Sequence, residues 1–156
     1  QHFMDFCLRQ AELAEDSGEV PVGAVVVLGG KVIGRGSNQN KTLSDPTAHA
    51  EMIAISAACN QVGSRYLEKA TIYVTIEPCA MCLGAAVQAR LRRIVYGAAD
   101  PKAGAVASVM EFPFGKLNHR PEVAGGVMAV ECASILREFF RPRRRRAPVQ
   151  PPRIRI

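Results

Sequence analysis

Hydrophobic and polar residues follow two different patterns over the first part of the chain. Over residues 3–16 the apolar positions recur at the spacing of one face of an amphipathic helix. Residues 22–28 are instead a run rich in β-branched side chains, and a short apolar pair at 32–33 follows Gly29-Gly30. Because paired glycines favour a tight turn between two strands, this segment predicts a β-hairpin after the first helix.

Strands and helices are expected to alternate after the hairpin. Short apolar runs rich in β-branched residues predict strands, whereas longer stretches with helical spacing predict helices. The expected order is a helix at about 48–60, a strand at 70–76, a helix at about 79–91 and a strand at 94–97. Asp45 or Thr47 is the expected cap of the first of these helices, and Pro78 stands where the second begins.

The last third of the chain has fewer regular elements. Residues 100–124 are punctuated by glycine and proline and predict a loop, with a short helical piece near 107–110. A strand at 127–130 and a helix at 132–140 are expected to follow. The alternation of strands and helices after an opening hairpin indicates an α/β fold, with a central mixed sheet of about five strands covered by helices.

Charge is distributed unevenly along the chain. The 156 residues carry a formal net charge of +6. Residues 141–156 contain seven arginines and no acidic residue, so residues 1–140 sum to −1. We therefore expect one domain over 1–140 and a flexible Arg- and Pro-rich tail over 141–156, in which prolines block a long helix. Such a tail points to a polyanion, nucleic acid first, and a solvated tail without contacts is the alternative.

Apolar runs and cysteines indicate the compartment. No apolar run approaches the roughly 18 residues of a membrane span, so no membrane partner is expected. Two of the five cysteines stand in a Cys-x-x-Cys pattern, which favours a metal over a disulfide. Cys7, Cys59 and Cys132 lie in apolar surroundings and are expected to be buried thiols. Free thiols of this kind suit a reducing cytoplasm.

Two short motifs carry the candidate chemistry. His49-Ala50-Glu51 is followed after 26 residues by Pro78-Cys79-Ala80-Met81-Cys82. One imidazole and two thiols leave the fourth tetrahedral position of a zinc ion open for water, whereas a structural zinc site is normally closed by four protein ligands. Cys79 and Cys82 are spaced to share one helix face, and the positive end of a helix favours their thiolates. The motifs therefore predict a catalytic zinc site.

Glu51 is the expected acid–base group of that site. Zinc lowers the pKa of a bound water to roughly 7. A carboxylate two residues from the imidazole ligand is placed to take the proton of this water, pass it to the ring nitrogen beside the attacked carbon, and then protonate the departing amine. This arrangement, with a glutamate that does not ligate the metal, is the signature of zinc-dependent nucleobase deaminases.

Over about residues 3–142 the chain resembles the bacterial-type tRNA adenosine deaminases. The matching segments include Val20–Ala24, Asp45–Glu51, Tyr73–Cys82, Tyr96–Ala105, Asn118–Arg120 and Phe139–Arg141. This family converts adenosine at the wobble position of a tRNA anticodon to inosine. The resemblance implies a three-layer cytidine-deaminase-like fold, a homodimer with one Zn²⁺ per subunit, and a tRNA anticodon stem-loop as the partner.

The same resemblance assigns roles to individual residues. The metal ligands are His49, Cys79 and Cys82, with Glu51 as general acid and base. Asn38 looks like the residue that contacts the flipped nucleotide, since an amide both donates and accepts; a turn residue at a strand end is the alternative. Val22 and Ala50 are expected to line the base pocket. Asp100 resembles a position beside the RNA backbone, where a carboxylate can accept from a 2′-hydroxyl, or else it caps the next turn.

Two other functions compete with this assignment. A guanine or cytosine deaminase acting on a free base shares both motifs but needs no arginine tail. A catalytically silent RNA-binding subunit would be expected to lack the glutamate, whereas Glu51 is present. Deamination of an anticodon stem-loop rather than of free bases separates the first alternative from the tRNA enzyme.

Overall fold

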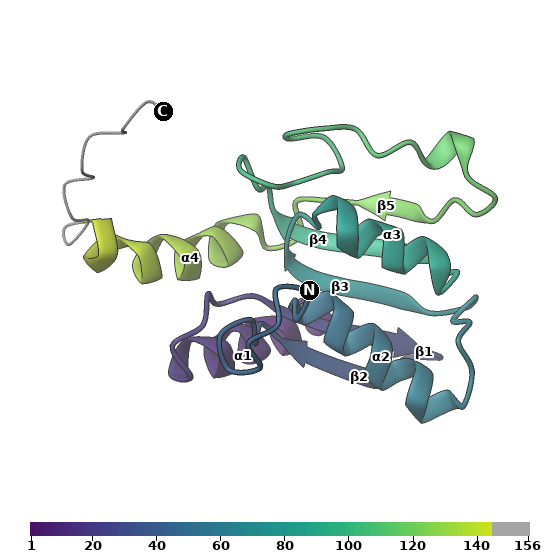
Figure 1. Cartoon of the computed structure of the whole chain (residues 1–156), viewed down its shortest axis with the longest axis horizontal. Coiled ribbons are helices and arrows are strands. Elements are labelled where there is room, and N and C mark those ends of the chain that lie inside the picture. The colour runs from purple at the N-terminus through teal and green to yellow at the C-terminus, as the bar shows by residue number, and fades with distance from the viewer. Residues whose placement is uncertain (145–156) are drawn as a thin grey trace, which may run out of the picture.

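The computed structural model describes residues 1–144 (Figure 1), so the expected tail lies outside the described residues from position 145 onward. The elements, in chain order, are α1 (His2–Asp16), β1 (Gly23–Leu28), β2 (Lys31–Ser37), α2 (Ala50–Val62), β3 (Thr71–Ile76), α3 (Ala80–Gln88), β4 (Arg93–Ala98), the 3₁₀ helix η1 (Phe114–Lys116), β5 (Glu122–Ala124) and α4 (Ala129–Arg144).

The strands form one mixed sheet in the order β2-β1-β3-β4-β5. The strand β1 pairs antiparallel with both β2 and β3, whereas β3, β4 and β5 are parallel to one another. The hairpin at Gly29-Gly30 joins β1 to β2, as the glycine pair predicts. The expectation of a mixed five-stranded α/β sheet is therefore confirmed.

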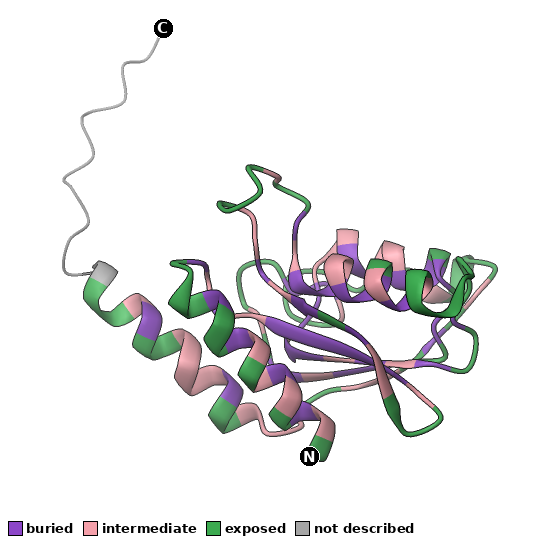
Figure 2. Ribbon diagram, turned by 90° about the horizontal axis from the view of Figure 1, so that it is seen from below, coloured by how far each residue is buried: buried purple, intermediate pink, exposed green. Residues whose placement is uncertain are grey.

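Helices cover both faces of the sheet, which confirms the three-layer arrangement (Figures 1 and 2). Along β1 successive side chains point to opposite faces. Ala24 and Val26 join the core beneath α2 and α3, whereas Val25 and Val27 join the core beneath α1 and α4. The second core includes Met4, Cys7 and Cys132 from these two helices. All of these side chains are buried, and they hold the sheet between two helical layers.

The helix α2 lies in direct contact with β2. A Cβ atom added at Gly36 would stand only 2.0 Å from the carbonyl oxygen of Ala50, and one at Gly34 only 2.3 Å from that of Ala54. Glycine is therefore required at both strand positions for the helix to approach so closely. This packing fixes the first turn of α2 against the end of β2, where Asn38 follows the strand.

The region after residue 100 differs most from the sequence-based expectations. Residues 107–110 form turns rather than a short helix, and the 3₁₀ helix lies further on, at Phe114–Lys116. The strand expected at 127–130 is wrong, because the last strand is Glu122–Ala124 and α4 already begins at Ala129. Four apolar residues in a row fit the start of a helix as well as a strand, so periodicity could not separate the two.

Helix boundaries also differ from the expected ones. The N-cap of α2 is His49, and Asp45 instead accepts hydrogen bonds from the N–H and hydroxyl of Thr47 in the turn before the helix. The helix α3 ends at Gln88 rather than near 91. The helix α4 continues past Pro142 to Arg144, where a proline near a helix end removes only one intrahelical hydrogen bond.

The three cysteines outside the Cys-x-x-Cys motif differ in their exposure. Cys7 and Cys132 are buried thiols as expected, whereas Cys59 is partly exposed on α2.

Within residues 1–144, none of the helices combines the length and the apolar character needed to cross a membrane.

Candidate active site

The two sequence motifs meet at the N-terminal ends of α2 and α3. His49 is the N-cap of α2 and Cys79 is the N-cap of α3, each with an extended backbone. Cys82 lies in the first turn of α3, and Glu51 in the first turn of α2. Both helices therefore direct their positive dipole ends at the same place, which favours thiolate and carboxylate anions there.

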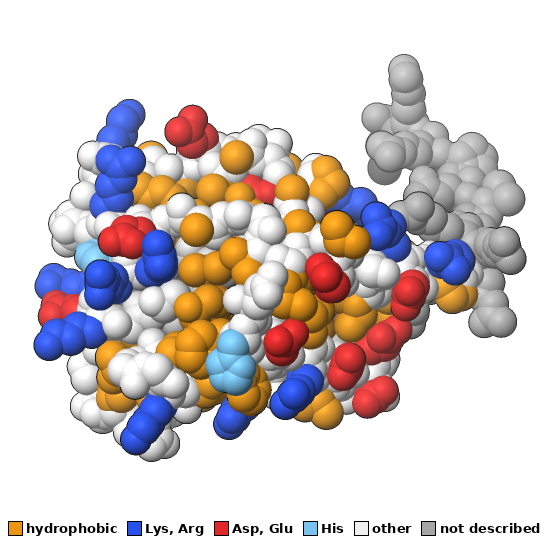
Figure 3. Space-filling view, turned by 180° about the vertical axis from the view of Figure 1, so that it is seen from behind, with side chains coloured by type: hydrophobic (Ala, Val, Ile, Leu, Met, Phe, Trp, Pro, Cys, Tyr) orange, Lys and Arg blue, Asp and Glu red, His pale blue; other side chains and the backbone are white. Residues whose placement is uncertain are grey.

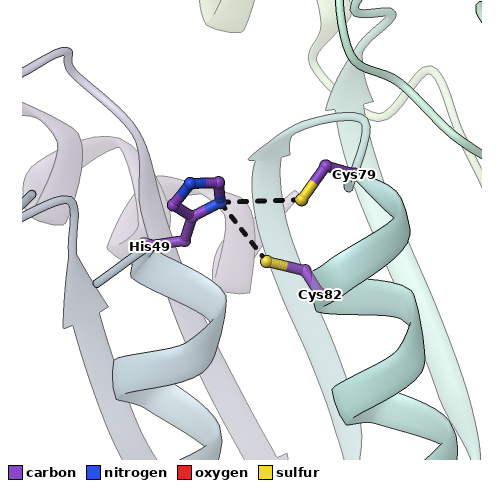
Figure 4. Close-up of side chains that lie close together, drawn as sticks. All are labelled: His49, Cys79 and Cys82. Atoms are coloured by element: carbon purple, nitrogen blue, oxygen red, sulfur yellow. Dashed lines mark hydrogen bonds between the residues drawn. The ribbon is translucent and has the colours of Figure 1, made fainter. Parts of the chain in front are cut away.

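His49, Cys79 and Cys82 form a group that could hold a metal ion (Figure 4). The imidazole Nδ1 lies 3.6 Å from the sulfur of Cys79 and 3.5 Å from that of Cys82. All three ligand atoms lie within 4.8 Å of one another. Glu51 is not part of this group.

The protons of the two thiols are linked. The hydrogen bond with Cys82 lowers the pKa of Cys79 to about 4, and contact with the His49 ring adds to this effect against the cost of burial. The hydrogen bond to Cys79 and burial raise the pKa of Cys82. Each thiol stabilises a thiolate on its neighbour only while it keeps its own proton, so the pair favours one thiolate and one thiol. A bound dication would favour loss of the second proton as well.

Glu51 is a buried carboxyl group, with 4% of its surface exposed. Burial raises the pKa of this carboxyl above its ordinary value, and the nearby His49 ring opposes part of that shift. Its Oε2 atom has no hydrogen-bond partner within residues 1–144. A buried, unpaired carboxyl oxygen beside three side chains that could hold a metal is placed to accept a proton and to donate it onward.

A cavity of about 420 Å³ lies beside the metal-binding group. Its size falls within the range of pockets that hold small ligands. Seven of the eight site residues expected from the sequence line it, and the eighth, Cys82, belongs to the candidate metal group; the seven are Val22, Asn38, His49, Ala50, Glu51, Cys79 and Asp100.

Asn38 lines this cavity and carries an unpaired, buried acceptor. Its side chain is 7% exposed, and its Nδ2 donates to the carbonyl oxygen of Val20 at 3.4 Å. Its Oδ1 has no partner among the described residues. The amide is thus held through its nitrogen while its oxygen stays available for an N–H or O–H donor on a ligand.

Asp100 lies in the cavity wall at the end of β4. Its Oδ1 accepts from the N–H of Lys102 at 2.9 Å, so the side chain does cap the following turn. The carboxylate retains further acceptor positions, and the capping role therefore does not exclude a contact with a ligand.

Several cavity residues were not expected from the sequence. The far wall is formed by α4, through Ala133, Leu136, Arg137 and Phe140, and the Nζ of Lys102 lies 5.6 Å from the centre of the Phe140 ring. The sequence predicts this helix, but it does not predict that the helix forms a wall of the cavity. Glu77 also lines the cavity. Its position next to Pro78-Cys79 was the available signal, but the sequence gives no reason for a carboxylate there.

Comparison with known proteins finds deaminases both among family models and among individual relatives. A family model described as MafB19-like deaminase matches residues 1–144. A tRNA-specific adenosine deaminase of Agrobacterium fabrum is 49% identical over 92% of this chain and 95% of its own length. The corresponding protein of Bacillus subtilis is 43% identical over 92% of this chain and 90% of its own length.

Among solved structures, a tRNA deaminase is also more similar to this chain than a guanine deaminase is. A structure from work on A-to-I editing by tRNA:A34 deaminases at the wobble position has a TM-score of 0.81 and 46% identity, and it covers 86% of this chain and 99% of its own. The guanine deaminase of Bacillus subtilis has a TM-score of 0.61 and 31% identity, with 75% of this chain and 85% of its own covered. On these similarities, the chain belongs to the family of tRNA-specific adenosine deaminases.

Proposed function

We propose that the chain catalyses the zinc-dependent hydrolytic deamination of adenosine to inosine at the wobble position of a tRNA anticodon. The observation that carries this proposal is the unpaired, buried Oε2 of Glu51 beside His49, Cys79 and Cys82. Identities of 43–49% to tRNA-specific adenosine deaminases, against 31% to a guanine deaminase, favour adenosine in tRNA over the free-base alternative.

The donor set fits zinc. Sulfur at about 2.3 Å and imidazole nitrogen at about 2.0 Å from a tetrahedral zinc would lie roughly 3.5 Å from each other. The nitrogen–sulfur distances of 3.5 and 3.6 Å agree with that spacing. Three protein ligands would leave one coordination position open, as in catalytic rather than structural zinc sites. Zinc bound here would supply a water with a pKa lowered to roughly 7.

Glu51 and Asn38 supply the remaining chemistry in this proposal. The Glu51 carboxylate takes one proton from the attacking water and delivers it to the ring nitrogen next to the reacting carbon. It then takes the remaining proton of the added hydroxyl and passes it to the exocyclic amine, so that the carbon–nitrogen bond breaks and ammonia leaves. Burial supports both steps, because a raised pKa lets the carboxyl hold the proton between them. Asn38 orients the flipped nucleotide by accepting a hydrogen bond at Oδ1, while Val22 and Ala50 line the space for the purine.

The direct test is inosine formation in a synthetic anticodon stem-loop with adenosine at the wobble position. We expect conversion of this RNA and no turnover of free adenine, guanine or cytosine under the same conditions. Turnover of a free base together with an unreacted stem-loop would instead assign the chain to the free-base deaminases.

Asn38→Ala should weaken use of the RNA substrate without affecting the metal. The variant leaves a donor on the bound nucleotide unpaired, which costs roughly 5- to 150-fold in kcat/KM. Steady-state deamination of the stem-loop measures the effect, and zinc content by elemental analysis should equal that of the wild type. Unchanged kcat/KM would assign Asn38 to the turn after β2 alone.

We further propose that tRNA contacts the basic tail as well as the cavity. Acidic side chains gather over the α1 and α4 side of the molecule in Figure 3, and α1 alone contains Asp5, Glu12, Glu15 and Asp16. An anionic RNA is repelled by such a surface, so favourable long-range attraction must come from elsewhere. Residues 145–156 hold four arginines and no acidic residue, so they are one source of such attraction.

Deleting residues 145–156 should reduce the salt dependence of tRNA binding and leave the chemical step nearly unchanged. This truncation keeps α4, which ends at Arg144. If about three of the removed arginines contact phosphate, the slope of log K against log salt should fall by roughly 2–3. Binding of full-length tRNA at several salt concentrations measures this slope. An identical slope for both proteins would show that the tail is solvated and makes no contact.

We propose that the protein is a cytoplasmic homodimer, as its resemblance to the bacterial-type tRNA adenosine deaminases implies. Exposed apolar side chains after β4 are available for such an interface, with Val109 at 51%, Met110 at 50% and Leu117 at 42% exposure. Sedimentation of the full chain should give twice the mass of one subunit, and a monomer at micromolar concentration would contradict the assignment.

A further inference from the structure

Glu77 lies directly between β3 and the Pro78-Cys79 turn, and its side chain is 1% exposed. Three consecutive backbone N–H groups, those of residues 106, 107 and 108, donate to its Oε1 at 2.8–3.0 Å. The N–H of Asp100 donates to Oε2 at 3.1 Å, and the Ser108 hydroxyl donates to the same oxygen. One buried carboxylate therefore receives five hydrogen bonds from the loop after β4.

The same loop is joined to the metal-binding turn by backbone contacts. The N–H of Glu77 donates to the carbonyl of Ala98 at 2.8 Å, and the N–H of Ala105 donates to that of Pro78 at 2.9 Å. Gly104 lies against the carboxylate, since an added Cβ would be 2.4 Å from Oε2. The loop and the turn that carries Cys79 are thus packed as one unit.

The loop has a second surface that faces the cavity. Residues 98–103 line the same cavity as Asn38 and Ala50. A shift of this segment relative to Cys79 would change the width of the space for a ligand. The carboxylate of Glu77 is therefore placed between the metal-binding turn and one wall of the ligand site.

Only a carboxylate satisfies all of these donors. An ionised carboxylate accepts through both oxygens, whereas an amide replaces one acceptor by two N–H donors. Convergent backbone N–H groups also provide a concave site for negative charge. Five donors converge on the two oxygens of Glu77, an arrangement that suits the ionised carboxylate.

We infer that Glu77 is a positioning residue that sets the cavity wall formed by residues 98–103 at a fixed place relative to Cys79. It holds the loop in the conformation that receives the nucleotide, so the loop does not have to be ordered when RNA binds. The inference rests on the proposed function, because the wall can act on binding only if a nucleotide enters this cavity.

Glu77→Gln is the test, with amide exchange and kinetics as two separate measurements. The glutamine oxygen should take the place of Oε1 and keep its three N–H donors. The new –NH₂ group would then face the N–H of Asp100, while the Ser108 hydroxyl can turn to accept. We expect hydrogen exchange of the Asp100 amide to accelerate at least about tenfold. KM for the stem-loop should rise roughly 5- to 100-fold, with kcat within about threefold and zinc content unchanged.

Glu19→Gln provides the matched control. Glu19 is also 1% exposed and accepts from a loop, through the N–H of Thr42 at 2.7 Å and its hydroxyl at 3.0 Å. Both bonds end on Oε1, so a glutamine oxygen can replace it, and neither KM nor the exchange of residues 98–108 should change. A Glu77→Gln variant with faster exchange but an unchanged KM would overturn the inference, because the wall would then not affect binding.

Two further outcomes are decisive. Loss of zinc and of kcat in Glu77→Gln would overturn the inference in favour of a role in building the metal site. If Glu77→Gln does not fold, Gly104→Ala perturbs the same contact from the loop side and should raise KM in the same way. Failure of the proposed function looks different, because wild-type protein would then form no inosine in the stem-loop at all.

Discussion

Glu51→Gln should keep the fold and the metal and lower the deamination rate at least about 100-fold, the lower end of a general acid–base contribution. The amide cannot carry a proton from water to the ring and on to the leaving amine. Its shape still fills the buried position, and Glu51 lies outside the His49, Cys79 and Cys82 group, so zinc should be retained. Single-turnover deamination of the stem-loop at saturating enzyme isolates this step from binding.

The buried surroundings of Glu51 make a matched control necessary. Glu19→Gln changes another buried glutamate whose oxygen accepts from Thr42 rather than facing the cavity, and its single-turnover rate should equal that of the wild type. A near-normal rate in Glu51→Gln, with zinc present in both variants, would remove Glu51 from the proton-transfer steps. A rate loss shared equally by both variants would point to a general effect of replacing a buried carboxyl group.

Local patterns predicted the parts of the fold that depend on few residues. The β-branched run of β1, the Gly29-Gly30 turn and the helical spacing of α1 act over short distances, and each of these elements was found where expected. The region between β4 and α4 was predicted less well. The strand β5 has only three residues and owes its existence to pairing with Arg93–Val95, a contact that no local pattern encodes.

The candidate site shows the same division. The spacing of His49, Cys79 and Cys82 follows from metal coordination, and the structure brings the three side chains together as that spacing requires. The close approach of α2 to β2 depends on Gly36, which the sequence presents only as one of several hairpin glycines. The roles of Glu77 and of the α4 wall depend on which loop and helix pack against the cavity. Those are tertiary contacts, and they became visible only in the structure.

Cys82→Ser should remove the metal and the activity together. A serine hydroxyl is a poor replacement for a thiolate ligand, and loss of an outer-sphere partner alone already weakens metal binding 10- to 100-fold, so loss of a ligand should cost at least about 100-fold in affinity. Ligand binding stabilises the folded state, and a loss of this size lowers the free energy of unfolding by about 2.7 kcal/mol at formerly saturating zinc. For a chain of this size the midpoint of thermal unfolding should fall by roughly 5–10 °C.

Cys59→Ser is the control for this variant, because Cys59 is a partly exposed thiol on α2 outside the metal group. It should keep full zinc content, activity and unfolding temperature. Elemental analysis and thermal unfolding, each measured with and without added zinc, separate the two causes of instability. In the wild type and in Cys59→Ser a chelator should lower the unfolding temperature, whereas in Cys82→Ser it should have almost no further effect. Full zinc content in Cys82→Ser, or an equal response of all three proteins to the chelator, would show that Cys82 is not a ligand.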